Sequence, residues 1–407
     1  MQQTPDDFQN TDRFPDLLPQ REDAPEDWPD ETPEEATVVR RPKKRRRRWY
    51  HVVLRITLFL LKIVLGLVVS AAIAAAGLIG YLTMTEYNPS HAENAQFGSY
   101  TADETLNKTT IRVLTLNTGY AGLGEDADFF MDGGKGVRTA DRAQVEENMK
   151  GISAVLRRSG ADFILLQEVD TDSKRTYRLN QWNYYEQALR RYESRFALNY
   201  SCQYVPYPLS ERIGRVNSGL VTLSRYDISS ATRYALPCPF SWPVRVANLK
   251  RCLLLSRIPI DGSDKELVLV NLHLEAYDDG EGKAEQTEAL LELLQAEYEK
   301  GNYVVAAGDF NQLFPRTEDT YPIKSTSDWT PGTLGSAPAG WRYAFDKSTP
   351  TCRLLNEPYS PRSAKTQYYV IDGFLLSPNV RLESVETLDQ GFGYTDHNPV
   401  IAELTLE

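Results

Sequence analysis

Residues 162–170 read DFILLQEVD, a run of apolar residues that begins and ends in acidic ones. Such a run is typical of a buried β-strand whose last residues reach the edge of a sheet. The further runs of this form are IRVLTLN (111–117), GLVTLSRY (219–226), RCLLLSRIPI (251–260), ELVLVNLHLEAY (266–277), YVVAAGDFN (303–311), YYVIDGFLLS (368–377) and NPVIAELTLE (398–407). The chain beyond residue 109 is therefore expected to be rich in β-sheet.

Two amphipathic helices are expected among these strands. RAQVEENMKGISAVLRRSG (142–160) and AEQTEALLELLQAEYEKG (284–301) each end in glycine, a common helix stop signal. Many strands with few helices between them predict an α/β architecture of sheets packed on each other and flanked by helices. Residues 109–407 are expected to form one domain of this kind.

The N-terminal region changes composition along its length. Residues 1–40 hold 12 acidic and 3 basic side chains and few aliphatic ones, and residues 41–48 (RPKKRRRR) hold seven basic ones. A segment of this composition does not bury enough apolar surface to fold, so residues 1–48 are expected to be disordered. Residues 1–40 therefore carry a net charge of −9 and residues 41–48 a charge of +7. Since the whole chain has a net charge of −11, the part after residue 48 has a net charge of −9.

Residues 49–86 are predicted to contain a transmembrane helix. The 23 residues from Ile63 to Thr85 carry no charge and are long enough to cross a bilayer. The basic run precedes them, which favours a single-pass signal anchor in the cell membrane, with the N-terminus cytoplasmic and the C-terminal domain extracytoplasmic. Residues 87–108 then form a stalk. A cleaved signal peptide is the alternative, because AAIAAAG (71–77) offers small residues, but the apolar segment is longer than such peptides.

The four cysteines lie after this helix, at positions 202, 238, 252 and 352. No C-x-x-C spacing is present, which gives no support to a zinc or thioredoxin-like site. The sequence does not decide whether these cysteines form disulfides or are free buried thiols.

Three long segments without clear periodicity are expected to be loops: residues 119–141, 236–251 and 313–364. Functional sites are often built from such loops where they leave rigid strands. Their sequences carry no readable code for a particular ligand.

Polar side chains stand at the ends of most of the predicted strands. They are carboxylates, amides and imidazoles: Asn117, Glu168, Asn271, His273, Asp309, Asn311, Asp372, Asp396 and His397. Carboxylate and amide oxygens suit Mg²⁺, Mn²⁺ or Ca²⁺, and histidines beside carboxylates suit proton transfer near neutral pH. This inventory indicates metal-assisted hydrolysis of a phosphate ester.

Each of these residues also has a simpler explanation. Asp309 in GDFN and Asp372 in IDG could be turn residues, and His273 alternates with leucines and could be a core histidine. The joint pattern argues against these explanations, because the chain from residue 109 onward has only two histidines and both lie in strand-end clusters.

The order TLNTGY, LLQEVD, GLVTLSRY, VNLHLE, GDFNQ, IDGFLLS, TDHNPV resembles the endonuclease/exonuclease/phosphatase superfamily, which has the DNase I-like fold. The resemblance covers residues 109–407. It implies a four-layer α-β-β-α sandwich of two mixed sheets faced by helices, with the site at one edge. It is closest to membrane-anchored bacterial members that have no assigned substrate.

The resemblance also implies roles for the strand-end residues. Glu168 would be the central ligand of a divalent metal, Mg²⁺ or else Mn²⁺ or Ca²⁺, and Asn117 and Asp396 would support that site. The other roles concern the substrate. Asp309 and Asn311 would bind the phosphate and position the attacking water, His397 would contact the phosphate or carry a proton with Asp372 orienting it, and His273 and Asn271 would contribute further proton-transfer or phosphate contacts.

The expected substrate is a phosphodiester or phosphomonoester, in a lipid head group or another envelope or soluble compound, and the lipid bilayer is the expected partner of residues 63–85. An extracellular DNase I-like nuclease is the alternative, and the charge of −9 after residue 48 disfavours it mildly. Gly119 stands where abasic-site endonucleases of this fold carry an acidic residue, which argues against DNA repair. A non-catalytic anchored binding module is a third, lesser alternative. The sequence indicates no oligomeric state.

Overall fold

The computed structural model describes residues 45–138, 140–278, 280–324 and 329–407. Within these residues the strands form two seven-stranded mixed sheets. The first sheet has the order β1 (Ala92–Asn94), β7 (Ser230–Ala235), β8 (Cys252–Pro259), β9 (Glu266–His273), β10 (Tyr303–Asp309), β16 (Asp372–Leu376), β13 (Arg342–Ala344). The second has the order β17 (Val380–Thr387), β18 (Val400–Leu406), β3 (Thr110–Asn117), β4 (Phe163–Asp170), β6 (Gly214–Ser224), β5 (Glu193–Val205), β2 (Gln96–Phe97).

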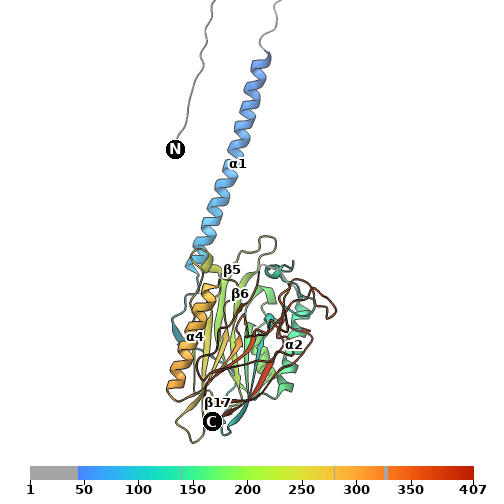
Figure 1. Cartoon of the computed structure of the whole chain (residues 1–407). Helices are drawn as coiled ribbons and strands as arrows, with labels where there is room; N and C mark the ends of the chain where they lie inside the picture. The colour runs from blue at the N-terminus through green and yellow to red at the C-terminus, as the bar shows by residue number, and fades with distance from the viewer. Residues whose placement is uncertain (1–44, 139, 279, 325–328) are drawn as a thin grey trace, which may run out of the picture. The chain divides into compact units, whose positions relative to one another are not determined.

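Helices cover the outer faces of both sheets, and Figure 1 shows α2 and α4 on opposite sides of the strands. One apolar core joins residues of β3 and β18 to residues of β8 and β10, so it lies between the two sheets. A second core joins β4 to α2 (Arg142–Ser159) and α3 (Gln181–Ala188), and a third joins β9 to α4 (Glu281–Glu299). The expected four-layer α-β-β-α sandwich is confirmed.

The parallel strand pairs explain where the helices lie. β3 and β4 are parallel, as are β9 and β10, and each pair is connected through a helix, α2 and α4 respectively. Helix α2 begins after Asp141, whose side chain accepts a hydrogen bond from the Gln144 backbone N–H, and ends before Gly160 in left-handed conformation. Parallel strands bring their carboxyl ends to the same edge of a sheet, which is where the polar residues stand.

Several elements were not expected from the sequence. Strand β5 mixes polar residues, several of them buried, with apolar ones, and β7, β17 and α3 are similarly mixed in composition. Two short pairs, β11 (Gln312–Leu313) with β12 (Gly332–Thr333) and β14 (Cys352–Arg353) with β15 (Tyr368–Tyr369), lie within or next to the expected loop 313–364. The other two loops contain short 3₁₀ turns, η1 (Gly119–Ala121), η2 (Phe130–Asp132) and η4 (Val244–Ala247), and η3 (Lys174–Thr176) follows β4.

The segment expected as a stalk contains two edge strands. Within residues 87–108, β1 pairs with β7 of one sheet and β2 pairs with β5 of the other. These pairs satisfy backbone groups that an extended stalk would leave to water, which the polar sequence of the segment does not reveal.

Helix α1 (Arg45–Met84) is long and apolar enough to cross a membrane. It begins within the basic run, so residues 45–48 are helical, and the expectation that they belong to a disordered tail is wrong. Arginine is a good helix former, and the helix extends through this part of the run. The acidic segment 1–40 and residues 41–44 lie outside the described residues.

The pairing of β10 with β16 places two glycines and two aspartates side by side. Gly308 lies opposite Gly373, and Asp309 lies opposite Asp372. A Cβ atom on Gly308 would lie 1.9 Å from the carbonyl oxygen of Leu272 in β9, and one on Gly373 would lie 2.9 Å from the carbonyl oxygen of Ala344. Only glycine therefore allows this close approach of backbones just before the two aspartates.

We expect Gly308→Ala to destabilise the domain by about 3 kcal/mol or more, because the added methyl group meets backbone rather than a movable side chain. The measurement is the thermal melting temperature followed by circular dichroism. Gly335→Ala is the control, since a Cβ there has nothing within 4 Å. Equal melting temperatures for the two variants would contradict the packing described here.

Candidate functional site

Both sheets contribute the ends of their strands to one cluster of polar side chains. His273 ends β9 and lies in register with Asp309 at the end of β10, and Asp309 lies opposite Asp372 of β16. The second sheet contributes Asn117 at the end of β3 and Glu168 near the end of β4. The second sheet also contributes Asp396 and His397, which come just before its strand β18.

One oxygen atom, Oδ2 of Asp309, is the centre of this cluster. It accepts a hydrogen bond from Nδ2 of Asn117 at 3.1 Å. The two imidazoles approach it as well, with Nε2 of His273 at 3.6 Å and Nε2 of His397 at 3.9 Å. Three residues that are up to 280 positions apart in sequence therefore surround a single carboxylate oxygen.

The position of Asp309 disfavours its charged form. Burial and the neighbouring Asp372 carboxylate raise the pKa of Asp309 to about 7. Its second oxygen, Oδ1, accepts the backbone N–H of Asn311 at 2.8 Å, which fixes the orientation of the carboxyl group. A carboxyl group with a pKa near neutrality can take up and release a proton under physiological conditions.

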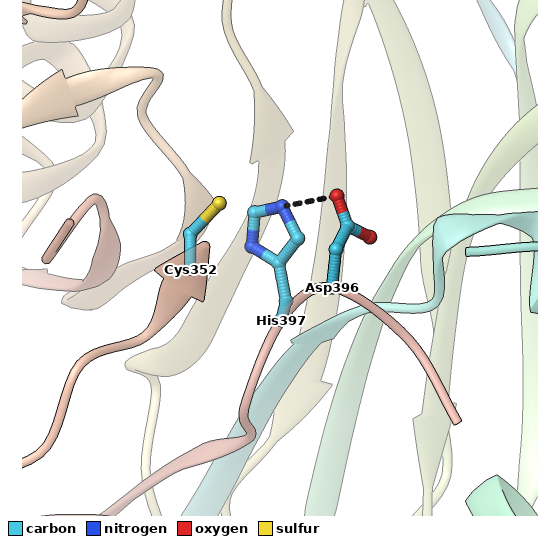
Figure 2. Close-up of side chains that lie close together, drawn as sticks. All are labelled: Cys352, Asp396 and His397. Carbon is cyan, nitrogen blue, oxygen red and sulfur yellow. Dashed lines mark ion pairs between the residues drawn. The ribbon is translucent and has the colours of Figure 1, made fainter. Parts of the chain in front are cut away.

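His397 is held by Asp372. Its Nδ1 lies 2.8 Å from Oδ2 of Asp372, which leaves Nε2 directed toward Asp309 and Asp396. Burial disfavours the charged imidazolium, but Asp372, Cys352 and Asp396 together outweigh burial and raise the pKa of His397 well above its usual range. Figure 2 shows the ring of His397 between Asp396 and the thiol of Cys352, whose own pKa burial raises to about 12.

His273 differs from His397 in its surroundings. Burial lowers the pKa of His273 well below its ordinary value, and the Arg251 guanidinium and His397 add to this effect. Among the residues that the structure describes, none forms a hydrogen bond with its Nδ1. The cluster thus holds one imidazole that favours the charged form and one that favours the neutral form.

Glu168 lies on a β-bulge. The register of β4 against β6 shifts between Leu166 and Val169, and Glu168 has a positive φ of 55°. A non-glycine residue in this region carries strain of about 1–3 kcal/mol, which is common at functional sites. The bulge brings the carboxylate toward Asn117, whose Nδ2 lies 3.3 Å from Oε1.

The donor set fits a hard divalent cation. Burial raises the pKa of both Glu168 and Asp396, and the negative charge of Asp396 raises that of Glu168 further. A divalent cation would neutralise these carboxylates. The amide of Asn117 lies beside Glu168, with its Nδ2 toward that carboxylate and its Oδ1 accepting the Gly119 backbone N–H at 3.0 Å.

Among the residues that the structure describes, two groups of His, Cys and carboxylate side chains are close enough to hold an ion: Cys352, Asp396 and His397 form one, and Asp309, Asp372 and His397 form the other. The first contains a protonated thiol, which is a poor ligand for a hard cation. In the second, the hydrogen bond between Asp372 and His397 already uses the nearest oxygen and nitrogen.

Asn271 does not join the cluster, and its expected phosphate contact is incompatible with its position. Its Nδ2 donates to the carbonyls of Leu166 and Val221 at 3.0 Å, and its Oδ1 accepts from Gln167 at 2.8 Å. It lies on the same face of β9 as His273 but two residues farther from the strand end, so it lies between the sheets and joins them. Asn311 does reach the site, where its Nδ2 donates to the Leu274 carbonyl.

Sequence reasoning missed several side chains around the cluster. Arg175 forms two hydrogen bonds with Asp170, and its Cζ lies 3.6 Å from the ring centroid of Tyr120. Its positive charge lowers the pKa of Glu168 and so opposes the effect of burial there. Tyr277 donates a 2.8 Å hydrogen bond to buried Asp132. The only available signal for Arg175 was its place just after the strand that carries Glu168.

The cluster opens into a cavity of about 660 Å³. Asn311, Asp396 and His397 line it at one place, and all three expected long loops contribute to its walls, through Phe130, Val246 and Leu355 among others. All four cysteines, at described positions, are free, and only Cys238 is exposed.

Comparison with known proteins agrees with this geometry. Residues 114–397 match the model of the Endonuclease/Exonuclease/phosphatase family. An endonuclease/exonuclease/phosphatase from Beutenbergia cavernae DSM 12333 has 19% sequence identity and a TM-score of 0.52, covering 74% of this chain and 72% of that one. This likeness shows a shared fold.

Two further solved structures are less similar. ANGEL2, described as a 2',3'-cyclic phosphatase, has 15% identity and a TM-score of 0.49, covering 75% of this chain and 98% of that one. TDP2 from Caenorhabditis elegans has 15% identity and a TM-score of 0.46, covering 74% of this chain and 75% of that one. No curated protein matches the chain.

We expect Asp372→Asn to lower the pKa of His397 in metal-free protein, because the substitution removes the charge that favours imidazolium while burial still opposes it. His397 would then lose its proton at a lower pH than in the wild type. The measurement is a pH titration of the imidazole NMR signals, with His397→Gln to assign them. Asp264→Asn, at an exposed carboxylate, is the control. Identical titrations in wild type and Asp372→Asn would contradict the assigned contact.

Proposed function

Because the chain belongs to the Endonuclease/Exonuclease/phosphatase family, we propose that it is a membrane-anchored, divalent-metal-dependent phosphoesterase. The substrate is a phosphodiester or phosphomonoester, in a lipid head group or in another envelope or soluble compound. The observation that supports this most is the convergence of Asn117, His273 and His397 on one oxygen of Asp309. These groups together can orient a water molecule and stabilise charge on a phosphate.

We assign the roles from the contacts. Asp309 polarises the attacking water through Oδ2, and Asn311 helps to bind the phosphate. His397, oriented by Asp372 through the 2.8 Å contact at Nδ1, presents Nε2 to a phosphate oxygen. His273, whose Nε2 lies 3.6 Å from the same oxygen of Asp309, is a second proton-transfer or phosphate-binding group.

Glu168, Asn117 and Asp396 would hold the metal, with Mg²⁺ as the first candidate and Mn²⁺ or Ca²⁺ as alternatives. When bound, the ion supplies a positive charge that polarises the phosphoryl oxygens. The bulge at Glu168 supports this assignment, since it directs a carboxylate toward the other ligands at the cost of backbone strain.

We also infer that α1 anchors the chain in the cell membrane, with the N-terminus in the cytoplasm and the catalytic domain on the opposite side. The seven basic residues at 41–48 and the uncharged stretch 63–85 support this orientation. An extracytoplasmic nuclease remains the second candidate, because the fold is shared with nucleases and phosphatases. The acidic charge of the chain after residue 48 disfavours tight binding to nucleic acid.

The full-length protein is expected to hydrolyse at least one member of a panel of bis-p-nitrophenyl phosphate, plasmid DNA, sphingomyelin and inositol phosphates. Turnover should require Mg²⁺ or Mn²⁺ and should be lost in EDTA, because the buried carboxylates otherwise repel a phosphate. Product release is measured by absorbance, gel mobility or phosphate assay. Metal-independent turnover, or none on any substrate, would refute the proposed enzyme.

The same assay tests the residue roles. Asp309→Ala and His397→Ala should each reduce kcat/KM by about 10²-fold or more. His91→Ala is the control, since this histidine is exposed and its ring contacts Tyr234 of β7. Full activity in either site variant would refute the site assignment even if the enzyme were real.

A protease added to intact cells should digest the C-terminal domain, because the basic run keeps the N-terminal side in the cytoplasm. The domain is followed with an antibody to a C-terminal tag. Lysed cells provide the control for protease sensitivity. If the protease does not digest the domain even in cells whose outer barrier is permeabilised, so that the protease reaches the membrane, the domain is cytoplasmic and the proposed orientation is wrong.

A further inference from the structure

The cavity that contains the site extends to helix α1. Asp396 and His397 line one part of it, and Leu78, Ile79 and Leu82 line another. These three residues lie within the uncharged stretch 63–85, so the walls of one cavity join the reacting groups to the apolar helix. Its volume of about 660 Å³ lies within the range of about 300–1,000 Å³ that is usual for small-molecule sites.

The end of α1 is part of the domain core. Leu82 is 3% exposed and packs with Val205 and Val246 of the domain, and Leu78 packs against the same cluster. Polar contacts hold the helix end in this place. Trp242 Nε1 donates to Thr83 Oγ1 at 3.1 Å, and Lys250 Nζ lies 2.8 Å from Glu86 Oε1.

The loops beside this helix end expose large apolar side chains. Tyr207 and Leu209 follow β5 and are 58% and 76% exposed, and Trp242 and Val244 are 56% and 57% exposed. Tyr207 contacts Phe130 of the cavity wall, with ring centroids 5.4 Å apart, and itself lines the cavity with Val244. An apolar rim of this kind is typical of surfaces that contact a membrane or an apolar ligand.

The cationic side chains in the wall are already engaged. Among the described lining residues, Arg175 is paired with Asp170, Arg251 with Glu275, and Arg353 with the carbonyls of Gly124 and Ala127. Polyphosphates and nucleic acid strands need several available cations along their path, which this wall does not offer. Its apolar side chains favour a ligand with a hydrocarbon chain.

We propose that the substrate is a lipid phosphate ester whose hydrocarbon chain lies in this cavity, between the reacting groups and the end of α1. The assignment rests on the proposed phosphoesterase function and specifies its substrate class. The phosphate lies where His397 lines the cavity, 3.9 Å from Asp309 Oδ2, and the chain passes the apolar wall formed by residues such as Ile213 and Ala247. The apolar rim then faces the bilayer from which the lipid enters.

The test compares the binding of ethylphosphonate and hexylphosphonate, which have no ester to hydrolyse, to the full-length protein in phosphatidylcholine nanodiscs with Mg²⁺. Burial of one methylene strengthens binding about fourfold, so four methylenes should give a ratio of dissociation constants on the order of 10². Isothermal titration calorimetry measures both ligands, and empty nanodiscs correct for partition into lipid.

Two substitutions alter the cavity without touching the reacting groups. Ala247→Phe fills it, and Ile213→Asn makes its wall polar, so each should reduce the hexyl-to-ethyl ratio to below about tenfold while ethylphosphonate binding is unchanged. The matched controls are Ala337→Phe and Ile260→Asn, at partly buried positions outside the cavity lining. Both controls should keep the wild-type ratio.

Equal binding of the two phosphonates by the wild type would overturn the proposal, and so would equal ratios in cavity and control variants. Hydrolysis of bis-p-nitrophenyl phosphate without any chain-length preference would overturn the substrate class alone and leave the phosphoesterase function in place. A strong chain-length preference without turnover of any phosphate ester would overturn the proposed function, and with it the substrate assignment.

Discussion

The burial of several carboxylates within one small volume is the constraint on which the site depends. Asp309 and Asp372 are neighbours in paired strands because Gly308 and Gly373 let three backbones approach closely. Charged groups buried in this way are unfavourable unless partners compensate them. His397 compensates Asp372, Asn117 donates to Asp309, and Arg175 lies near Glu168. The remaining excess of negative charge is the physical reason to expect a cation.

The sequence predicted the sandwich well because buried strands are short apolar runs and the two long helices carry clear stop signals. It failed for β5 and β7, which contain buried polar residues among apolar ones, and for β17, an edge strand with several exposed polar residues. Edge strands β1 and β2 were taken for a stalk for the same reason. Pairing with a distant strand stabilises them, and no local pattern reveals a distant partner.

Residue identity at strand ends predicted most of the cluster, but not the depth of each side chain. Asn271 and His273 lie on one face of β9, two positions apart. His273, at the end of the strand, reaches the site, whereas Asn271 lies between the sheets. The bulge at Glu168 has no sequence signal either, because it depends on how β4 pairs with β6. The roles of these residues remain proposals that rest on the contacts described.

The packing of Leu82, together with the contacts of Thr83 and Glu86, joins the C-terminal end of α1 to the catalytic domain. An enzyme on a flexible tether samples a hemisphere of solution whose radius is set by the linker. With residues 63–85 inserted in a bilayer as proposed, these contacts would instead keep the domain close to the membrane surface. Its encounters would then depend on lateral diffusion in two dimensions and on the amount of substrate per unit of membrane area.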